Sequence, residues 1–325
     1  MTAARRRAAA LAAALVVAAA GFALLRRPPA RPPLPCPHLA AVLAVPSLEA
    51  APVLLARLSL PGGVCRIAAA AEAADTAPLA VLPGDAFRPA SAARTRWLPF
   101  LLVAQRAASL LVARAPVAPH FLWHSLSGQT VVLSPAAGDL GGVVVTAMVA
   151  VHAVDGVALL RGLGERAFVA GTGAYAELPL WPAEALLLAG RAHPAADLAI
   201  QGGPLPAAVL AARPAFARRH PRLLAAIAVA VYGAELRLDR LGGRLADAWP
   251  TPLAPAARRA LAAALARARY AGVWPSDPRL DAALFTRLDV LLQGAGLVPV
   301  GPPPAALAWP AEAAMRRLAP VPQAG

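Results

Sequence analysis

The sequence predicts an α/β protein in which many of the strands pair in parallel. Short apolar runs of strand length alternate with longer segments whose apolar residues recur at helical spacing. Proline and glycine clusters, which favour turns, separate these segments. The 325 residues are enough for two lobes of ordinary domain size.

Strands and helices follow one another in the first part of the chain. We expect strands at 39–45, 64–67 and 79–82, with helices at 50–58 and 68–74 between them. The apolar runs 97–103 and 110–114 predict either a hairpin or two strands of a sheet.

Beyond residue 115 the balance shifts towards helices. We expect further strands at 130–133, 156–160, 167–169 and 209–212. Helical spacing predicts helices at 142–152, 183–189, 223–238, 255–270 and 281–294. The C-terminal third is therefore expected to be mostly helical.

The N-terminus has the pattern of a targeting segment. Three arginines precede an uninterrupted apolar run over residues 8–25, close to the length of about 20 residues that spans a membrane. Ala18–Ala20 offer a cleavage site, but residues 22–25 continue the apolar run, so both a cleaved signal peptide and a retained anchor fit. The proline-rich residues 26–37 predict a stiff tether, and the rest of the chain is expected outside the cytoplasmic membrane.

The two cysteines fit an exported protein. Cys36 and Cys65 are expected to form one disulfide, and two unpaired thiols are the alternative. The setting of Cys36, about ten residues beyond the apolar run, disfavours lipidation. No histidine or cysteine stands at ligand spacing from either thiol, so a metal site is not expected.

The charge is strongly basic. The sequence contains no lysine, and its arginines give a net charge of +14. Such a balance is compatible with nucleic acid, anionic lipid or anionic solutes as partners. The arginines are dispersed and are not interleaved with aromatic residues, which argues against nucleic acid.

A glycine-rich turn follows the expected strand at 130–133. Ser134, Gly138 and Leu140 lie at or near the start of the next helix, where backbone N–H groups bind oxyanions. Asp139 would repel an anion or favour a ligand that carries an amine. An ordinary turn explains the same residues equally well.

Three stretches resemble the solute-binding proteins of ABC transporters, in the nitrate/sulfonate/taurine and thiamine-precursor group. Residues 170–175 keep a glycine frame of that group with Ala174 in the acidic position, and Trp181 stands in place of the glutamate of a later Glu-Pro turn. His220-Pro221 precede a long helix, as in the group. The first stretch matches at Phe121, Trp123, Leu126, Gly128, Thr130 and Val131, with Gln129 in place of a lysine.

The resemblance covers about residues 97–297 and implies a periplasmic-binding-protein type II fold, with two α/β lobes and a ligand cleft. Lobe one would comprise 38–114 and 206–325, with a helical C-terminal part, and lobe two would comprise 115–205. The hinge crossings are expected near Leu110–Arg114 and Pro206–Ala212. Lobe one is trimmed relative to the group, because only residues 58–78 separate its first helix from its third strand.

By the same resemblance, the lobes would close over a small anionic or zwitterionic solute and then dock on an ABC permease and its ATPase. We expect a monomer that needs no cofactor, with the membrane as a partner only through the N-terminal segment. The expected ligand residues are Ser47, Leu48, Gly84, Asp85, Ser134, Gly138, Asp139, Leu140 and Trp181.

Two other functions stay open. One is a degenerate, membrane-anchored ligand sensor or partner-binding module of the same fold, which the trimmed lobe favours. The other is an enzyme resembling thiamine-pyrimidine synthases. The two widely spaced cysteines and the absence of a lysine for a Schiff base count against that enzyme, and no catalytic pattern stands out.

Overall fold

The computed structural model describes residues 39–45, 48–60, 63–70, 77–87, 96–134 and 140–297. Residues 59–64 group with a separate compact unit, and the other described residues form one unit, to which the following account refers. The short strands β2 (Leu58–Leu60) and β3 (Gly63–Cys65) pair with each other at the boundary.

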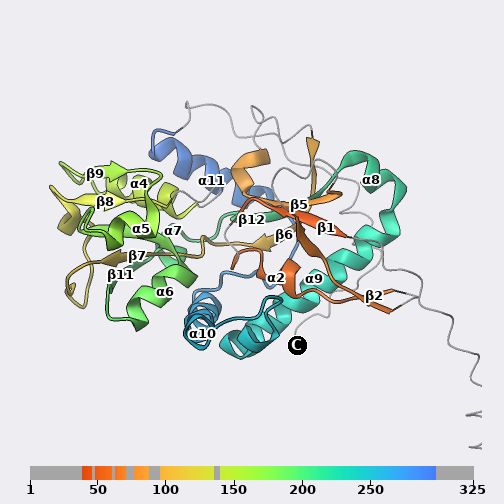
Figure 1. Ribbon diagram of the computed structural model, residues 1–325. Coiled ribbons are helices and arrows are strands. Elements are labelled where there is room, and N and C mark those ends of the chain that lie inside the picture. Colours follow the sequence, from red (N-terminus) through yellow and green to blue (C-terminus); the bar gives the residue numbers. More distant parts are fainter. Residues whose placement is uncertain are drawn as a thin grey trace, which may run out of the picture. The chain divides into compact units, whose positions relative to one another are not determined.

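The first sheet has the strand order β4-β1-β5-β12-β6 in the described part of the chain (Figure 1). Strand β1 runs parallel to both β4 and β5, whereas β12 runs antiparallel to β5 and β6. Every residue of β5 and β12 is buried, as expected of central strands covered on both faces. The bounds are β1 Ala40–Leu43, β4 Ala68–Ala70, β5 Leu79–Leu82, β6 Leu98–Ala104 and β12 Ala208–Ala212.

The second sheet has the order β11-β7-β10-β8-β9 and is the yellow-to-green part of Figure 1. Strand β8 is parallel to β9 and β10, whereas β7 is antiparallel to β10 and β11. In the β7–β10 register, Glu177 pairs with Leu111, and Pro179 with Ser109. The bounds are β7 Ser109–Ala113, β8 Thr130–Val132, β9 Ala158–Leu160, β10 Tyr175–Pro179 and β11 His193–Asp197.

Helices flank both sheets. In the described residues, α2 packs on α9, α6 on α10, and α4 on α11. The α-helices are α2 Ala51–Leu55, α4 Gly141–Val151, α5 Gly164–Val169, α6 Leu180–Leu188, α7 Leu198–Gly202, α8 Pro214–Arg219, α9 Pro221–Leu241, α10 Pro255–Tyr270 and α11 Ala282–Gly294. The 3-10 turns are η1 Gly84–Phe87, η2 Trp123–Leu126 and η3 Gly242–Ala248.

The chain crosses between the sheets at two segments that lie side by side. Residues 105–108 lead from β6 to β7, and residues 203–207 lead from α7 back to β12. The N–H of Leu205 donates to the carbonyl of Gln105 at 2.8 Å, so the two crossings are joined. The sequence placed the crossings near Leu110–Arg114 and Pro206–Ala212, but most of those residues belong to strands β7 and β12. We therefore propose that the two lobes meet at residues 105–108 and 203–207.

The α/β class predicted from the sequence is confirmed, but some local predictions are wrong. Residues 68–70 form strand β4 rather than the start of a helix, and residues 167–169 belong to helix α5 rather than a strand. Both stretches are short and apolar, so their periodicity does not separate the two structures. The sequence also missed strands β10 and β11, because Glu177 and Pro194 interrupt their apolar pattern.

The predicted run at 97–103 and 110–114 is not a hairpin. Its halves are β6 and β7, which belong to different sheets. No helix among the described residues is long and apolar enough to cross a membrane. The expected targeting segment at 8–25 lies outside the described residues.

Candidate functional site

Acidic and hydroxyl side chains are fully buried close to the crossings. Glu49, Ser109 and Glu177 each have 0% of their surface exposed, although their neighbours in the sequence are mostly apolar. Burying a carboxylate is costly unless hydrogen bonds compensate it. We call these three residues, together with the backbone of Ser134 and Gly141, the crossing cluster.

Glu49 ties the turn after β1 to the first crossing. Its Oε1 accepts a hydrogen bond from the N–H of Ala108 at 2.8 Å. The preceding carbonyl, of Leu48, accepts from the indole N–H of Trp274 at 3.2 Å, and the Leu48 side chain is itself buried. The turn is thus fixed to two segments that are distant in the sequence.

Glu177 lies on β10 and faces the turn between β8 and α4. Its Oε2 accepts from the backbone N–H of Ser134 at 3.0 Å. A Cβ on Gly141, the first residue of α4, would lie 2.4 Å from Oε1 of Glu177 and 2.6 Å from Oγ of Ser109. Only glycine therefore fits between these side chains and the helix.

This arrangement places a carboxylate of the protein at the N-terminus of α4. The first N–H groups of a helix have no partners within the helix, and the helix dipole favours negative charge there. Leu140, the N-cap residue of α4, makes no side-chain cap and is buried, with its carbonyl bonded to the N–H of Val144. Glu177 thus stands where the sequence predicted the anionic group of a ligand.

Gly84 joins the end of β5 to the second crossing. Its N–H donates to the carbonyl of Pro206 at 2.9 Å, so the amide is already occupied. A Cβ at Gly84 would lie 2.4 Å from Cγ of Pro206, which explains the glycine. Asp85 follows it as a half-buried residue in the first turn of η1, where a carboxylate is favoured.

Trp181 occupies a different place, on the first turn of α6. Its indole N–H donates to the carbonyl of Ala257 on α10 at 3.3 Å, and its ring meets Trp249 edge-on at 5.8 Å. Beside it, Glu184 on α6 pairs with Arg267 on α10 at 2.5 Å. These contacts hold the tryptophan against α10 and Trp249, and its expected role in ligand binding stays a prediction.

Several expected site residues lie outside the described residues. They are Ser47, Gly138, Asp139 and Cys36, and the disulfide between Cys36 and Cys65 stays a prediction. In the described part of the chain, no group of three histidine, cysteine or acidic residues is arranged to hold a metal ion.

Sequence reasoning missed the acids of the crossing cluster. The sequence patterns singled out none of Glu49, Ser109 and Glu177 as site residues. A usable signal was present, because Glu177 stands alone between apolar neighbours on a strand. A carboxylate in such a position needs a nearby hydrogen-bond donor, which points to a built polar site.

The fold is shared with solute-binding proteins of ABC importers. A ligand-binding component of an ABC-type import system from Staphylococcus aureus has a TM-score of 0.61 and 9% identity, and covers 82% of this chain and 93% of its own. The alkanesulfonate-binding protein SsuA from Xanthomonas axonopodis pv. citri, bound to MOPS, has a TM-score of 0.56 and 15% identity, with 83% and 96% covered. The chain thus has the two-sheet, periplasmic-binding-protein type of fold that the resemblance implied.

An enzyme also shares this fold. The desulfurization enzyme DSZB has a TM-score of 0.51 and 18% identity, and covers 86% of this chain and 99% of its own. No family model and no curated protein sequence matches this chain. A shared fold therefore does not show whether this chain binds a solute or catalyses a reaction. The function has to be argued from the residues of the site.

Proposed function

We propose that this protein is the extracytoplasmic solute-binding component of an ABC importer. It holds a small organic solute between two lobes, each built on one of the sheets, and the lobes close by rotation at the crossings. The crossing cluster supports this proposal most directly. Glu49 is hydrogen-bonded to the first connecting segment at Ala108, and Ser109 directly follows that segment, so these buried polar groups would sense whether the lobes are apart or together.

The solute is a zwitterion rather than a simple anion. An anionic group of the solute would compete with Glu177 for the N–H of Ser134 and for the start of α4. A cationic group of the same solute would draw the carboxylates of Glu49 and Glu177, and so free that N–H for the anionic group. Aminosulfonates and amino acids have this charge pattern, whereas nitrate, alkanesulfonates and neutral pyrimidine-like compounds lack the cation.

The remaining parts of the proposal follow from the same role. The protein would be a monomer that docks on a permease and its ATPase. It would be exported through residues 8–25, either as a cleaved signal peptide or as a retained anchor. Binding and release would need no cofactor and no catalytic step.

A degenerate sensor or partner-binding module is the second candidate. The observation that favours it is Glu177 itself, because a carboxylate of the protein satisfies the turn that would otherwise hold a ligand. An enzyme is a third candidate only through the shared fold of DSZB, and the described residues carry no metal-binding group that would add to it.

A thermal-shift screen of the full-length chain tests the proposal. The panel contains taurine, alkanesulfonates, nitrate, bicarbonate, amino acids and pyrimidines, and calorimetry follows each hit. Binding only to the native state raises Tm, and a ligand at a hundred times its Kd adds about 2.7 kcal/mol of stability. We expect zwitterions to give the largest shifts.

A matched pair of variants makes this screen specific. Glu177→Gln removes a charge of the crossing cluster, and Glu165→Gln removes an exposed charge on α5. The proposed site is supported if a zwitterion raises Tm less in Glu177→Gln than in the wild type and raises it equally in Glu165→Gln and the wild type. If no compound shifts Tm in the wild type or in Glu177→Gln, solute transport is rejected and the sensor is favoured.

A further inference from the structure

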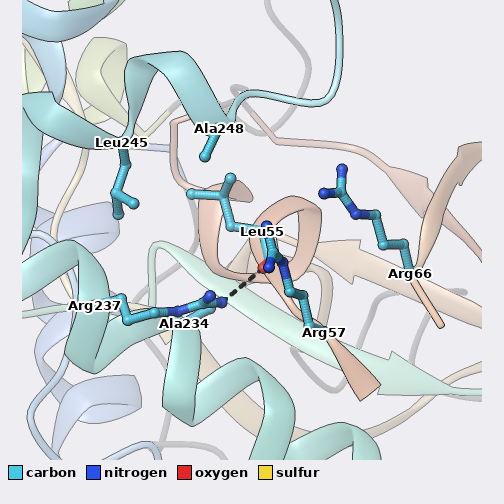
Figure 2. A pocket seen from close by; sticks show the side chains of 7 residues that line it. All are labelled: Leu55, Arg57, Arg66, Ala234, Arg237, Leu245 and Ala248. Carbon is cyan, nitrogen blue, oxygen red and sulfur yellow. Dashed lines mark hydrogen bonds between the residues drawn. The ribbon is translucent and has the colours of Figure 1, made fainter. Parts of the chain in front are cut away.

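A separate pocket on the first-sheet side of the chain is lined by three arginines (Figure 2). It lies where the end of α2, helix α9 and the turn η3 meet, and none of its residues belongs to the crossing cluster. Its lining consists of Leu55, Arg57, Arg66, Ala234, Arg237, Leu245 and Ala248.

The guanidinium groups differ in how firmly they are held. Arg237 is half-buried on α9, and its Nη2 donates to the carbonyl of Leu55 at 2.9 Å (Figure 2). Arg57 and Arg66 are exposed and also line the pocket. The pocket is therefore lined by one guanidinium group that a hydrogen bond holds in place, that of Arg237, and by two exposed ones, those of Arg57 and Arg66.

No carboxylate among the described residues forms an ion pair with any of these three arginines. Two acids are adjacent in sequence to lining residues: Asp247, next to Ala248, pairs with Arg258 on α10 at 3.3 Å, and Glu235, next to Ala234, is buried within α9. Like charges gathered in a partly enclosed space repel one another, and an anion placed between them removes this repulsion. Within the described residues, the positive charge of the pocket thus has no acidic partner.

The shape of the pocket limits what it can hold. The space that the centre of a water molecule can reach is about 20 Å³, slightly more than one water requires. The rest of the wall is apolar, formed by leucine and alanine side chains. A phosphate group is larger than that enclosed space, so it would lie in the mouth of the pocket, against the exposed guanidinium groups of Arg57 and Arg66. Guanidinium groups bind phosphate oxygens in a bidentate manner, which fits a ligand held in this way.

We propose that Arg57, Arg66 and Arg237 form a binding site for a phosphate group. The group is either free inorganic phosphate or the terminal phosphate of a small ester, since both present the same oxygens to the guanidinium groups. This site is independent of the solute site at the crossings, and each can be correct if the other is not.

Calorimetry on the full-length chain tests the proposal, with inorganic phosphate as the probe and chloride used to keep the ionic strength constant. The double variant Arg57→Gln/Arg66→Gln removes two exposed charges that hold no described contact in the fold. We expect it to weaken phosphate binding at least about tenfold, because charge-assisted hydrogen bonds are lost. Arg218→Gln/Arg219→Gln on α8 removes the same charge at exposed positions elsewhere and should leave the affinity unchanged.

Glycerol phosphate distinguishes the two sources of the phosphate group. Affinity equal to that of inorganic phosphate indicates that an ester fits the pocket, and much weaker affinity indicates the free ion. The proposal is overturned if the wild type binds neither compound, or if the two double variants lose affinity equally, because that result reports only the overall positive charge. Circular dichroism of each variant checks that it is folded.

Discussion

The carboxylate of Glu177 on β10 accepts a hydrogen bond from the backbone N–H of Ser134, with 3.0 Å between the two atoms. This hydrogen bond places a carboxylate of the protein itself beside Ser134, the last described residue between β8 and α4. A solute that uses the same turn has to displace that carboxylate or to neutralise it. The relationship therefore links the selectivity of the site to one side chain.

Replacing Glu177 by glutamine should change which solutes bind. The amide oxygen can still accept from Ser134, but the negative charge is gone. We expect zwitterions to bind about tenfold or more weakly and simple anions to bind more tightly, as measured by calorimetry. Glu165→Gln on α5 should leave both affinities unchanged. Equal effects on both classes of solute would contradict the role of Glu177.

A methyl group at Gly84 should destabilise the protein. The new Cβ would lie 2.4 Å from Cγ of Pro206 and 2.5 Å from its carbonyl oxygen, so the second crossing must move. We expect Gly84→Ala to lower the free energy of unfolding by about 1–3 kcal/mol in urea titrations. Gly233→Ala within α9 is the matched control. Nothing lies within 4 Å of its Cβ, so it should stabilise the helix by about 0.5–1 kcal/mol.

The ion pair between Glu184 and Arg267 should stabilise the contact between α6 and α10. The Nε–Oε1 distance is 2.5 Å, and the two side chains are 8% and 31% exposed. A double-mutant cycle with Glu184→Gln and Arg267→Gln should give a coupling energy of about 1–3 kcal/mol by chemical denaturation.

The exposed pair between Asp247 and Arg258 provides the comparison. Its side chains are 76% and 54% exposed, and its coupling energy should be about 0–1 kcal/mol. If the two cycles give the same value, burial does not strengthen the α6–α10 pair.

Glu235 should make the protein less stable as the pH rises. It is 1% exposed on α9, and neither carboxyl oxygen has a hydrogen-bond partner among the residues that the structure describes. Burial, reinforced by the negative charge of Asp277, raises its pKa well above the ordinary value of 4.5. The native state therefore keeps its proton longer than the unfolded state does. The stability contributed by the protonated acid is complete below pH 4.5 and is lost as the pH rises through the native pKa.

Glu235→Gln imitates the protonated acid and should remove this dependence. Its advantage over the wild type in free energy of unfolding should be near zero below pH 4.5 and should grow above it. The slope should be about 1.4 kcal/mol per pH unit until the native pKa is passed. Chemical denaturation between pH 4 and 8 measures this difference. An advantage that stays constant over the range would show that Glu235 titrates normally.

The sequence located most helices well because their signals are local. Prolines at the first turn and apolar residues at helical spacing predicted helices near Pro221–Leu241 and Pro255–Tyr270, and the structure has both. It failed at residues 68–70 and 167–169, where a few alanines and other apolar residues suit a strand or a helix equally. The neighbouring strand or helix decides such segments, and the sequence does not show which neighbour that is.

The sequence by itself determined the alternation of strands and helices, and the family resemblance carried by its motifs pointed to the correct two-sheet fold. Only the tertiary structure decided that Glu49 meets Ala108, that Glu177 caps the turn at Ser134, and which arginines gather in one pocket. Helix and strand periodicity is set by each residue's near neighbours. These contacts instead join segments tens of residues apart, and they exist only once β7, β10 and the crossings have been placed by the packing of both sheets.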